Sequence, residues 1–223
     1  ARTAEIIVGF LRAEVPLAKV DVVELDQARY RKGEWAVRQY YTAFTTFEPT
    51  RTQLAKALIT ESSDAAVKSE IAEDLCELIR ANPKTLYLLG PGSTIQAVAD
   101  ALGVKKTLLG IDALLCGRLV GHDLNEAGLL ELLERYGNAS LIVSPIGAQG
   151  FVLGRGNLQI SPVVIRRIGI DNIVVIATPA KLARTPALSF DTGDHALDAA
   201  FMTKRYIRVI TGFRRRRLTP VPQ

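Results

Sequence analysis

The stretch TLYLLGPGSTIQAVADALG, residues 85–103, decides the fold. It opens with a compact, mostly apolar run that predicts a buried strand. Residues 90–92, Gly-Pro-Gly, break this strand at once, and the apolar spacing over 95–102 predicts a helix that ends at Gly103. A buried strand, a glycine turn and a helix in this order are typical of an α/β domain whose parallel sheet is covered on both faces.

The same alternation continues along the chain. Compact strands are predicted at 107–115, 140–143, 172–177 and 205–213, and helices at 63–80, 125–136 and 162–168. We therefore predict that residues 61–223 form an α/β domain with a Rossmann-like, mainly parallel sheet and flanking helices.

Residues 1–60 follow another pattern and are predicted to form a smaller β-rich N-terminal part. A short amphipathic helix is predicted over 3–13, and strands over 20–25 and 35–47. The change between the two parts is placed near residues 48–62. Because the sequence begins without a methionine, we expect the N-terminal part to continue from a domain upstream.

Composition and cysteine usage are ordinary for a globular protein of the cytoplasm. Of the 223 residues, 48% are hydrophobic and 23% are charged. Cys76 and Cys116 have no paired spacing, which predicts neither a zinc site nor a disulfide framework and favours a reducing compartment. The sequence shows no apolar run long enough to span a bilayer and no signal peptide, so no membrane contact is expected.

The formal net charge of +5 owes much to the run Arg214–Arg217. This run is either a solvated tail or strand end, or a contact for a polyanion such as the phosphates of a nucleotide. A nucleic-acid partner is not expected, since only this run would support one.

The first glycine turn offers four candidates for binding an anion: Gly90, Gly92, Ser93 and Thr94. A turn between a buried strand and a helix leaves backbone N–H groups at the helix N-terminus, and the helix dipole there favours a phosphate or a carboxylate. The two hydroxyls add donors, or one of them caps the helix. A capped turn without a ligand is the alternative.

A second candidate is the glycine-rich stretch SPIGAQGFVLGRGNLQISP, residues 144–162. Glycines let the backbone approach a ligand closely, side-chain amides suit a base or a ribose, and an arginine offers a fork for a phosphate. A long glycine-rich connection without a ligand is the alternative. The nucleotide-binding residues predicted here are Gly147, Gln149, Gly150, Gly154, Arg155, Gly156, Asn157 and Gln159.

Carboxylates and a histidine in two further loops are weaker candidates. Asp191 and Asp194 flank a glycine turn. The two carboxylates are predicted either to hold Mg²⁺ or a ribose, or to form a turn in which Asp194 caps the next helix. His122 is either a general base or a solvated loop residue, and Asp123 and Asn125 are predicted to cap the helix that follows. The sequence shows neither a metal-ligand cluster nor a Ser/His/Asp arrangement, so it names no catalytic residue.

The second glycine-rich stretch resembles a signature of the ATP-NAD kinase family. Residues 144–151 and 154–162 are similar to the TPIGGQGF and GRGNQQISP segments of that family, and residues 87–94 are similar to its LGPGTT segment. The resemblance covers nearly the whole chain, is densest over 85–213, and is closest to the branch that includes acetoin-catabolism protein X.

The resemblance implies a cytoplasmic kinase, at least a dimer, that moves a phosphoryl group from ATP with Mg²⁺, or from another donor, to NAD or a related substrate. In NAD kinases the catalytic aspartate lies in a GGDGT motif, which this sequence does not contain. We expect that motif in the upstream domain, so that this chain is a C-terminal portion. The substrate loop of NAD kinases would fall on residues 144–151, where Gly147–Gly150 depart from the family's Gly-Ser-Thr-Ala and leave the substrate open.

Two other functions stay open. Residues 90–103 also resemble the glycine loop and helix of sugar-phosphate isomerases and deaminases, and residues 121–126 are similar to their second loop. That alternative predicts binding of a sugar phosphate without ATP or Mg²⁺. The third alternative is a regulatory module that senses a nucleotide without catalysis.

Overall fold

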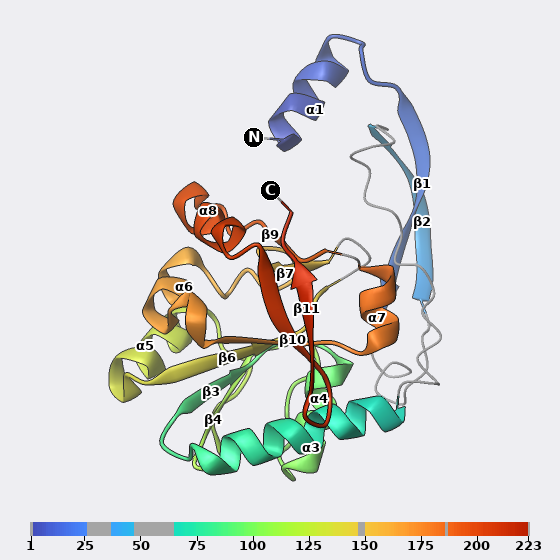
Figure 1. Ribbon diagram of the computed structural model, residues 1–223. Coiled ribbons are helices and arrows are strands. Elements are labelled where there is room, and N and C mark those ends of the chain that lie inside the picture. The colour runs from blue at the N-terminus through green and yellow to red at the C-terminus, as the bar shows by residue number, and fades with distance from the viewer. Residues whose placement is uncertain (1, 26–36, 47–64, 147–149, 186, 223) are drawn as a thin grey trace. The chain divides into compact units, whose positions relative to one another are not determined.

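The computed structural model (Figure 1) describes residues 2–25, 37–46, 65–146, 150–185 and 187–222. The chain forms two compact units, Ala1–Ser62 and Ser63–Gln223.

The first unit contains a helix and a two-stranded sheet. Helix α1 (Arg2–Leu11) is followed by β1 (Leu17–Leu25), which pairs antiparallel with β2 (Val37–Thr46). The predicted helix and both predicted strands are confirmed, and β1 begins earlier than expected, at Leu17. The continuation of this unit from an upstream domain stays a prediction.

The second unit is built on a seven-stranded sheet. Its strand order is β11-β10-β8-β6-β3-β4-β5. The four central strands β10, β8, β6 and β3 run parallel, while β4, β5 and β11 are antiparallel to their neighbours. The strand bounds are β3 (Leu86–Leu89), β4 (Asp112–Leu115), β5 (Arg118–Gly121), β6 (Ala139–Val143), β8 (Ile173–Ile176), β10 (Tyr206–Gly212) and β11 (Arg215–Pro220). The predicted α/β fold with a mainly parallel central sheet is confirmed.

Helices cover both faces of this sheet (Figure 1). On one face lie α3 (Ala65–Ala81) and α4 (Ser93–Ala101), whose apolar residues share a core cluster with the strands. On the other face lie α5 (Glu126–Tyr136), α6 (Pro162–Ile168) and α8 (His195–Thr203). Their Leu129, Val164 and Phe201 are buried in a second cluster.

Successive side chains of a strand point to opposite faces of the sheet, and this determines which of the two core clusters each side chain joins. In β3, Leu86 and Leu88 belong to the cluster under α5 and α6, whereas Tyr87 and Leu89 belong to the cluster under α3 and α4. This is the period of two that a strand requires, and each fully buried Leu contributes about 1.5–3 kcal/mol relative to exposure.

One strand differs from its prediction. The strand predicted over 107–115 begins only at Asp112 and runs antiparallel to β3. Residues 107–111 form a loop instead, because the backbone N–H and the hydroxyl of Thr107 both donate hydrogen bonds to the Asp112 carboxylate. At Cys116 and Gly117 the chain turns with positive φ angles and returns as β5, which was not predicted.

A second, smaller sheet includes part of the glycine-rich stretch. Strand β7 (Phe151–Leu153) pairs parallel with β9 (Ser189–Phe190), and Phe190 stacks on Phe201 of α8 at 4.0 Å between ring centroids. Helix α7 (Pro179–Arg184) and the short 3₁₀ helix η2 (Ile170–Asn172) complete the unit. Strands β7 and β9 and helix α7 were not predicted, and α8 was expected only as the helix that Asp194 would cap.

The arginine run forms a strand rather than a solvated tail. Residues Arg215–Arg217 lie in β11, and three of the four arginines pair with acidic residues spaced along one face of α3. The pairs are Arg215–Glu70, Arg216–Asp74 and Arg214–Glu77. The run therefore joins the last hairpin to α3 through these three ion pairs, and a contact with a polyanion stays a prediction.

Candidate functional site

The candidate site lies where two neighbouring parallel strands end. Leu89 at the end of β3 pairs with Ile142 of β6. The chain leaves β3 into α4 on one face of the sheet and leaves β6 toward α6 on the other face. Open α/β sheets bind their ligands at the carboxyl ends of strands where the chain reverses in this way.

The first glycine turn lies at the carboxyl end of β3. The N–H of Gly90 donates to the Ile142 carbonyl at 2.9 Å, and a Cβ at this position would come within 3.0 Å of that oxygen. Gly92 has φ +117° and is the N-cap of α4, which has no side-chain capping bond. The alternative that Ser93 or Thr94 only caps α4 is therefore wrong, since both lie inside the helix.

A lysine contacts the serine that follows each of these two strands. Lys68 Nζ of α3 donates to Ser93 Oγ at 3.1 Å, just beyond β3. Lys181 Nζ of α7 donates to Ser144 Oγ at 3.2 Å, just beyond β6. Thr178 caps α7 by accepting from the Lys181 N–H. Sequence reasoning missed both lysines, because they lie on helices far from the loops in sequence.

Within the second stretch, several predicted residues shape the loop. Gly150 has φ +73°, and a Cβ there would come within 2.4 Å of the Ala187 carbonyl. Gly154 has φ +90°, and its Cβ would come within 1.7 Å of the Asp191 carbonyl. Asn157 is 1% exposed, donates to the Val152 carbonyl at 2.8 Å and accepts from the Gly154 N–H at 3.1 Å.

Both ends of the Asn157 amide are thus used to close the loop, so the structure gives this residue a supporting role instead of a base or ribose contact. Gly156 is exposed with φ +77°, and Gln159 is half-buried. Gly147 and Gln149 lie outside the described residues.

Arg155 and Asp191, predicted separately, are brought together. Arg155 donates to Asp191 Oδ2 from Nε at 3.2 Å and from a terminal nitrogen at 3.1 Å, and its guanidinium lies 4.1 Å from the ring centre of Phe151. Both charged side chains are well exposed, so the pair itself stabilises the fold little.

Asp194 caps α8, as one of its two predicted roles required. Its Oδ1 accepts from the Leu197 N–H at 2.9 Å, and its Oδ2 accepts from Arg166 at 2.7 Å. The Arg166 hydrogen bond and the backbone bond of the cap hold the pKa of Asp194 below its usual value. Since Asp191 and Asp194 each neutralise an arginine, they do not form a ready Mg²⁺ site.

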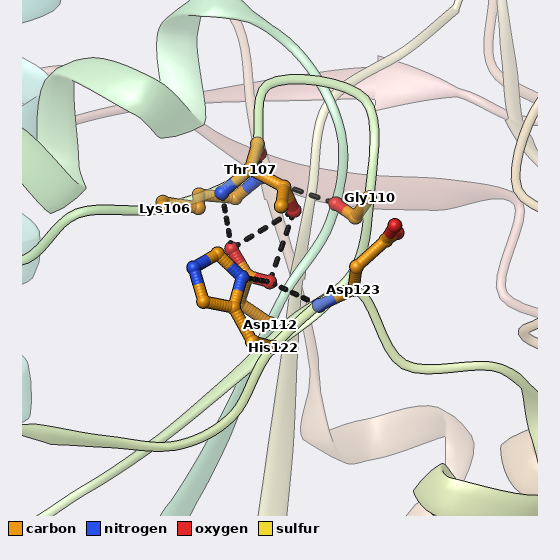
Figure 2. A network of polar contacts seen from close by, with 6 residues as sticks. All are labelled: Lys106, Thr107, Gly110, Asp112, His122 and Asp123. Atoms are coloured by element: carbon orange, nitrogen blue, oxygen red, sulfur yellow. Dashed lines mark hydrogen bonds and ion pairs between the residues drawn. The ribbon is translucent and has the colours of Figure 1, made fainter.

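A buried carboxylate organises the loops beside the first glycine turn (Figure 2). Asp112 is 0% exposed and pairs with Leu89 of β3 through the backbone. Its carboxylate accepts from the Thr107 N–H at 2.5 Å, the Thr107 hydroxyl at 2.9 Å and the Asp123 N–H at 2.7 Å. It also lies 3.1 Å from His122 Nδ1.

Sequence reasoning missed Asp112, although an aspartate inside an apolar strand is a signal, because a buried carboxylate needs partners. The prediction that Asp123 caps α5 is wrong, since its backbone N–H donates to the Asp112 carboxylate. The N-cap of α5 is Asn125, whose side chain accepts from the Gly128 N–H at 3.0 Å. The prediction for Asn125 is confirmed.

Lys106 lies under the same loop. Its side chain donates to the carbonyls of Thr107 and Gly110, and the residue is 7% exposed. Burial lowers the pKa of Lys106 to about 8, although the Asp112 and Asp123 carboxylates act in the opposite direction.

Comparison with protein families decides the affiliation. Residues 84–221 match the model of the ATP-NAD kinase C-terminal domain. The chain belongs to the ATP-NAD kinase family. No curated protein and no solved structure matches the chain. The branch of acetoin-catabolism protein X stays a prediction, as does a GGDGT motif upstream.

The matched region of this ATP-NAD kinase family member contains the glycine turn, the Asp112 network, the glycine-rich stretch and Lys181. Lys68 precedes it. Across the parts of the chain that the structure describes, no group of three or more His, Cys, Asp or Glu side chains is placed to hold a metal ion. None of the helices in those parts has the length and apolar character needed to cross a membrane.

A cavity of about 560 Å³ lies elsewhere, between the amino-terminal halves of β8 and β10. It arises because these strands pair only at Val175–Val209 and Ile176–Ile210. Its charged residues include Lys204, which pairs with Asp171, and Arg216, which pairs with Asp74. We place the functional site at the carboxyl edge because open α/β sheets bind their ligands there and both lysine–serine contacts lie at that edge.

Proposed function

We propose that the loops at the carboxyl ends of β3 and β6 bind the phosphates of a nucleotide, and that this chain is the C-terminal domain of a kinase transferring a phosphoryl group from ATP, or another donor, to NAD or a related substrate. The observation that carries the proposal is the pair of lysine contacts, Lys68 to Ser93 and Lys181 to Ser144. They bring two positive charges to the ends of adjacent strands.

The chemistry of this arrangement suits phosphate groups. A lysine ammonium is a compact charge with three donors, and the serine hydroxyls beside it add further donors. The N-terminus of α4, preceded by glycines and without a side-chain cap, adds the positive end of the helix dipole on the same side. Phosphoryl transfer needs mainly positioning and neutralisation of charge, which these groups supply.

Mg²⁺ would be carried largely by the phosphates of ATP. This ion usually keeps several waters and binds one or two carboxylates together with substrate phosphates. Asp191 pairs with Arg155 and Asp194 pairs with Arg166. In this proposal the two carboxylates therefore hold their loop in place and are not ligands of the ion. A phosphate contact by Arg155 stays a prediction and would require its guanidinium to leave Asp191.

The substrate distinguishes this proposal from its alternatives. A sugar-phosphate isomerase or deaminase would use the same glycine turn for a phosphate, without ATP, and a nucleotide-sensing module would bind without turnover. The assembly as at least a dimer and the cytoplasmic location also stay predictions.

Calorimetric titration of the chain with NAD, with ATP and Mg²⁺, and with a pentose phosphate tests the proposal. Binding of NAD or of ATP supports it, and formation of NADP from both separates a kinase from a sensor. Binding of the pentose phosphate alone would contradict it and favour the isomerase alternative.

A further inference from the structure

We propose that the cavity between β8 and β10 is a second binding site, which takes a small carboxylate that carries an apolar group. The cavity lies at the amino-terminal halves of these two strands, whereas the proposed nucleotide site lies at the carboxyl ends of β3 and β6. The inference therefore does not depend on the proposed function, and it assigns the chain a further ligand.

The cavity exists because the central sheet is split. Strands β8 and β10 first pair at Val175–Val209. One residue earlier in the same register, Val174 would pair with Arg208, but these two residues are not paired and both line the cavity. A ladder that stops inside a sheet leaves backbone N–H and C=O groups facing the gap, and such groups need a partner in a ligand or in water.

The most buried side chains of the lining are aromatic. Phe190 and Phe201 are 8% and 1% exposed, and their rings stack at 4.0 Å between centroids. Ile173 and Ile207, which are half-buried, line the same space. The volume of about 560 Å³ lies within the range of about 300–1,000 Å³ that is usual for small-molecule sites. An aromatic ring or a short aliphatic chain is therefore the group that suits the inner part of the cavity.

The charged side chains of the lining have a positive balance, since three cations stand against one carboxylate. Lys204 pairs with that carboxylate, Asp171, and Arg216 pairs with the buried Asp74. Among the ion pairs between residues that the structure describes, none includes the third cation, Arg208. Its guanidinium is thus available to a ligand, and its fork of N–H donors matches a carboxylate.

Arg208 lies where a ligand can enter the split. Its side chain is exposed, and it has the same strand parity as Ile210, which belongs to the core cluster under α3. Arg216, which pairs with α3, lines the cavity on that face, whereas Phe201 lines it from the cluster on the opposite face. A carboxylate bound to Arg208 therefore directs its apolar group through the split, toward the stacked phenylalanines.

The alternative is an exposed arginine that attracts any anion beside a gap filled with water. The two accounts differ in what the ligand must contain. A built site requires the carboxylate and the apolar group together, whereas a surface charge binds inorganic phosphate as well as any carboxylate.

Titration of the nitrogen-15-labelled chain with phenylacetate, followed by NMR of the backbone amides, tests the inference. Phenylacetamide removes the charge, acetate removes the ring, and inorganic phosphate supplies a different anion. We expect phenylacetate to shift the signals of Val174, Ile207 and Arg208 with a dissociation constant at or below about 1 mM, the affinity of a fragment of this size. Each of the other three probes should bind at least about tenfold more weakly.

Two variants separate Arg208 from general charge. We expect Arg208→Gln to weaken phenylacetate binding by about tenfold or more, because it removes the charged fork. Arg217→Gln is the matched control, since Arg217 is also exposed, lies on the neighbouring strand β11 and is outside the lining. It should change the affinity by less than about twofold, because salt screens exposed charges that do not contact the ligand.

Equal affinity for phenylacetate and phenylacetamide, or for phenylacetate and phosphate, would overturn the inference. Equal losses in the two variants, or a phenylacetate titration without shifts at Val174, Ile207 and Arg208, would overturn it as well. The amides of Gly90 and Gly92 should not respond to phenylacetate, so none of these results decides whether the nucleotide site exists.

Discussion

Arg216 reaches Asp74 with both terminal nitrogens, at 3.1 Å to Oδ1 and 2.7 Å to Oδ2, across the contact between β11 and α3. Asp74 is only 5% exposed and also accepts from the Arg214 N–H at 2.7 Å. A single carboxylate thus holds both a side chain and the turn of the last hairpin.

Asp74→Asn should destabilise the chain by about 2–3 kcal/mol, because removing one partner of a buried pair leaves the other without compensation. Urea unfolding followed by circular dichroism measures this loss. The matched control is Glu70→Gln, whose pair with Arg215 is more exposed and should contribute at most about 1 kcal/mol. Equal losses in the two variants would show that burial of Asp74 does not matter.

Gly154→Ala should cost more than Gly193→Ala. Both glycines have positive φ, +90° and +84°, so alanine is strained by about 1 kcal/mol at either position. Only at Gly154 would the new Cβ meet the Asp191 carbonyl at 1.7 Å, and we expect a total loss of at least about 3 kcal/mol there. Thermal unfolding of both variants measures the difference, and similar midpoints would contradict the close approach of the two backbones.

Lys106 should make stability rise with pH in the alkaline range. Its pKa in the folded chain is about 8, below the ordinary value of 10.5, because burial disfavours the charged form. Between these two values the unfolded chain binds more protons than the folded chain, so the free energy of unfolding increases with pH, by at most about 3 kcal/mol for this group. Below about pH 8 both states are protonated and this contribution is constant.

Urea unfolding at about pH 7 and about pH 10 should show this rise in the wild-type chain and a smaller rise in Lys106→Met. The variant removes the titrating group and keeps much of the apolar stem. Identical pH dependence in the two chains would rule out a lowered pKa at Lys106.

Lys68→Ala and Lys181→Ala should each weaken NAD or ATP binding by about tenfold to a hundredfold, since each removes a charged donor from the proposed phosphate site. Calorimetry measures the affinity. Lys84→Ala is the matched control, because this exposed lysine lies before β3, at the opposite edge of the sheet. Affinities that fall equally in all three variants would point to general charge loss instead of a local site.

Much of the fold was predictable because it depends on local patterns. The apolar run before Gly90 and the helix after it specify a βα unit, and the glycine before α4 predicts a phosphate-binding geometry. Helix α6, bounded by Ser161 and Gly169, was predicted with its correct limits, since its cap and its proline are adjacent in sequence.

The remaining features depend on partners far along the chain. The direction of β4 is decided by its pairing with Leu89 and by the turn at Cys116, which periodicity does not reveal. Lys68 is 25 positions from Ser93, and Arg216 is 142 positions from Asp74. From the sequence alone, a lysine on a helix and an arginine on a strand are expected to face solvent. Their hydrogen-bond acceptors become evident only in the folded structure.

The central claim is that a nucleotide binds at the carboxyl ends of β3 and β6. Titrating NAD into the nitrogen-15-labelled chain and following the backbone amide signals by NMR tests it most directly. The account predicts shifts at Gly90, Gly92 and Ser93, with those of Lys204 and Arg208 at the cavity between β8 and β10 unchanged. Shifts confined to Lys204 and Arg208 would place the ligand in that cavity and contradict the account.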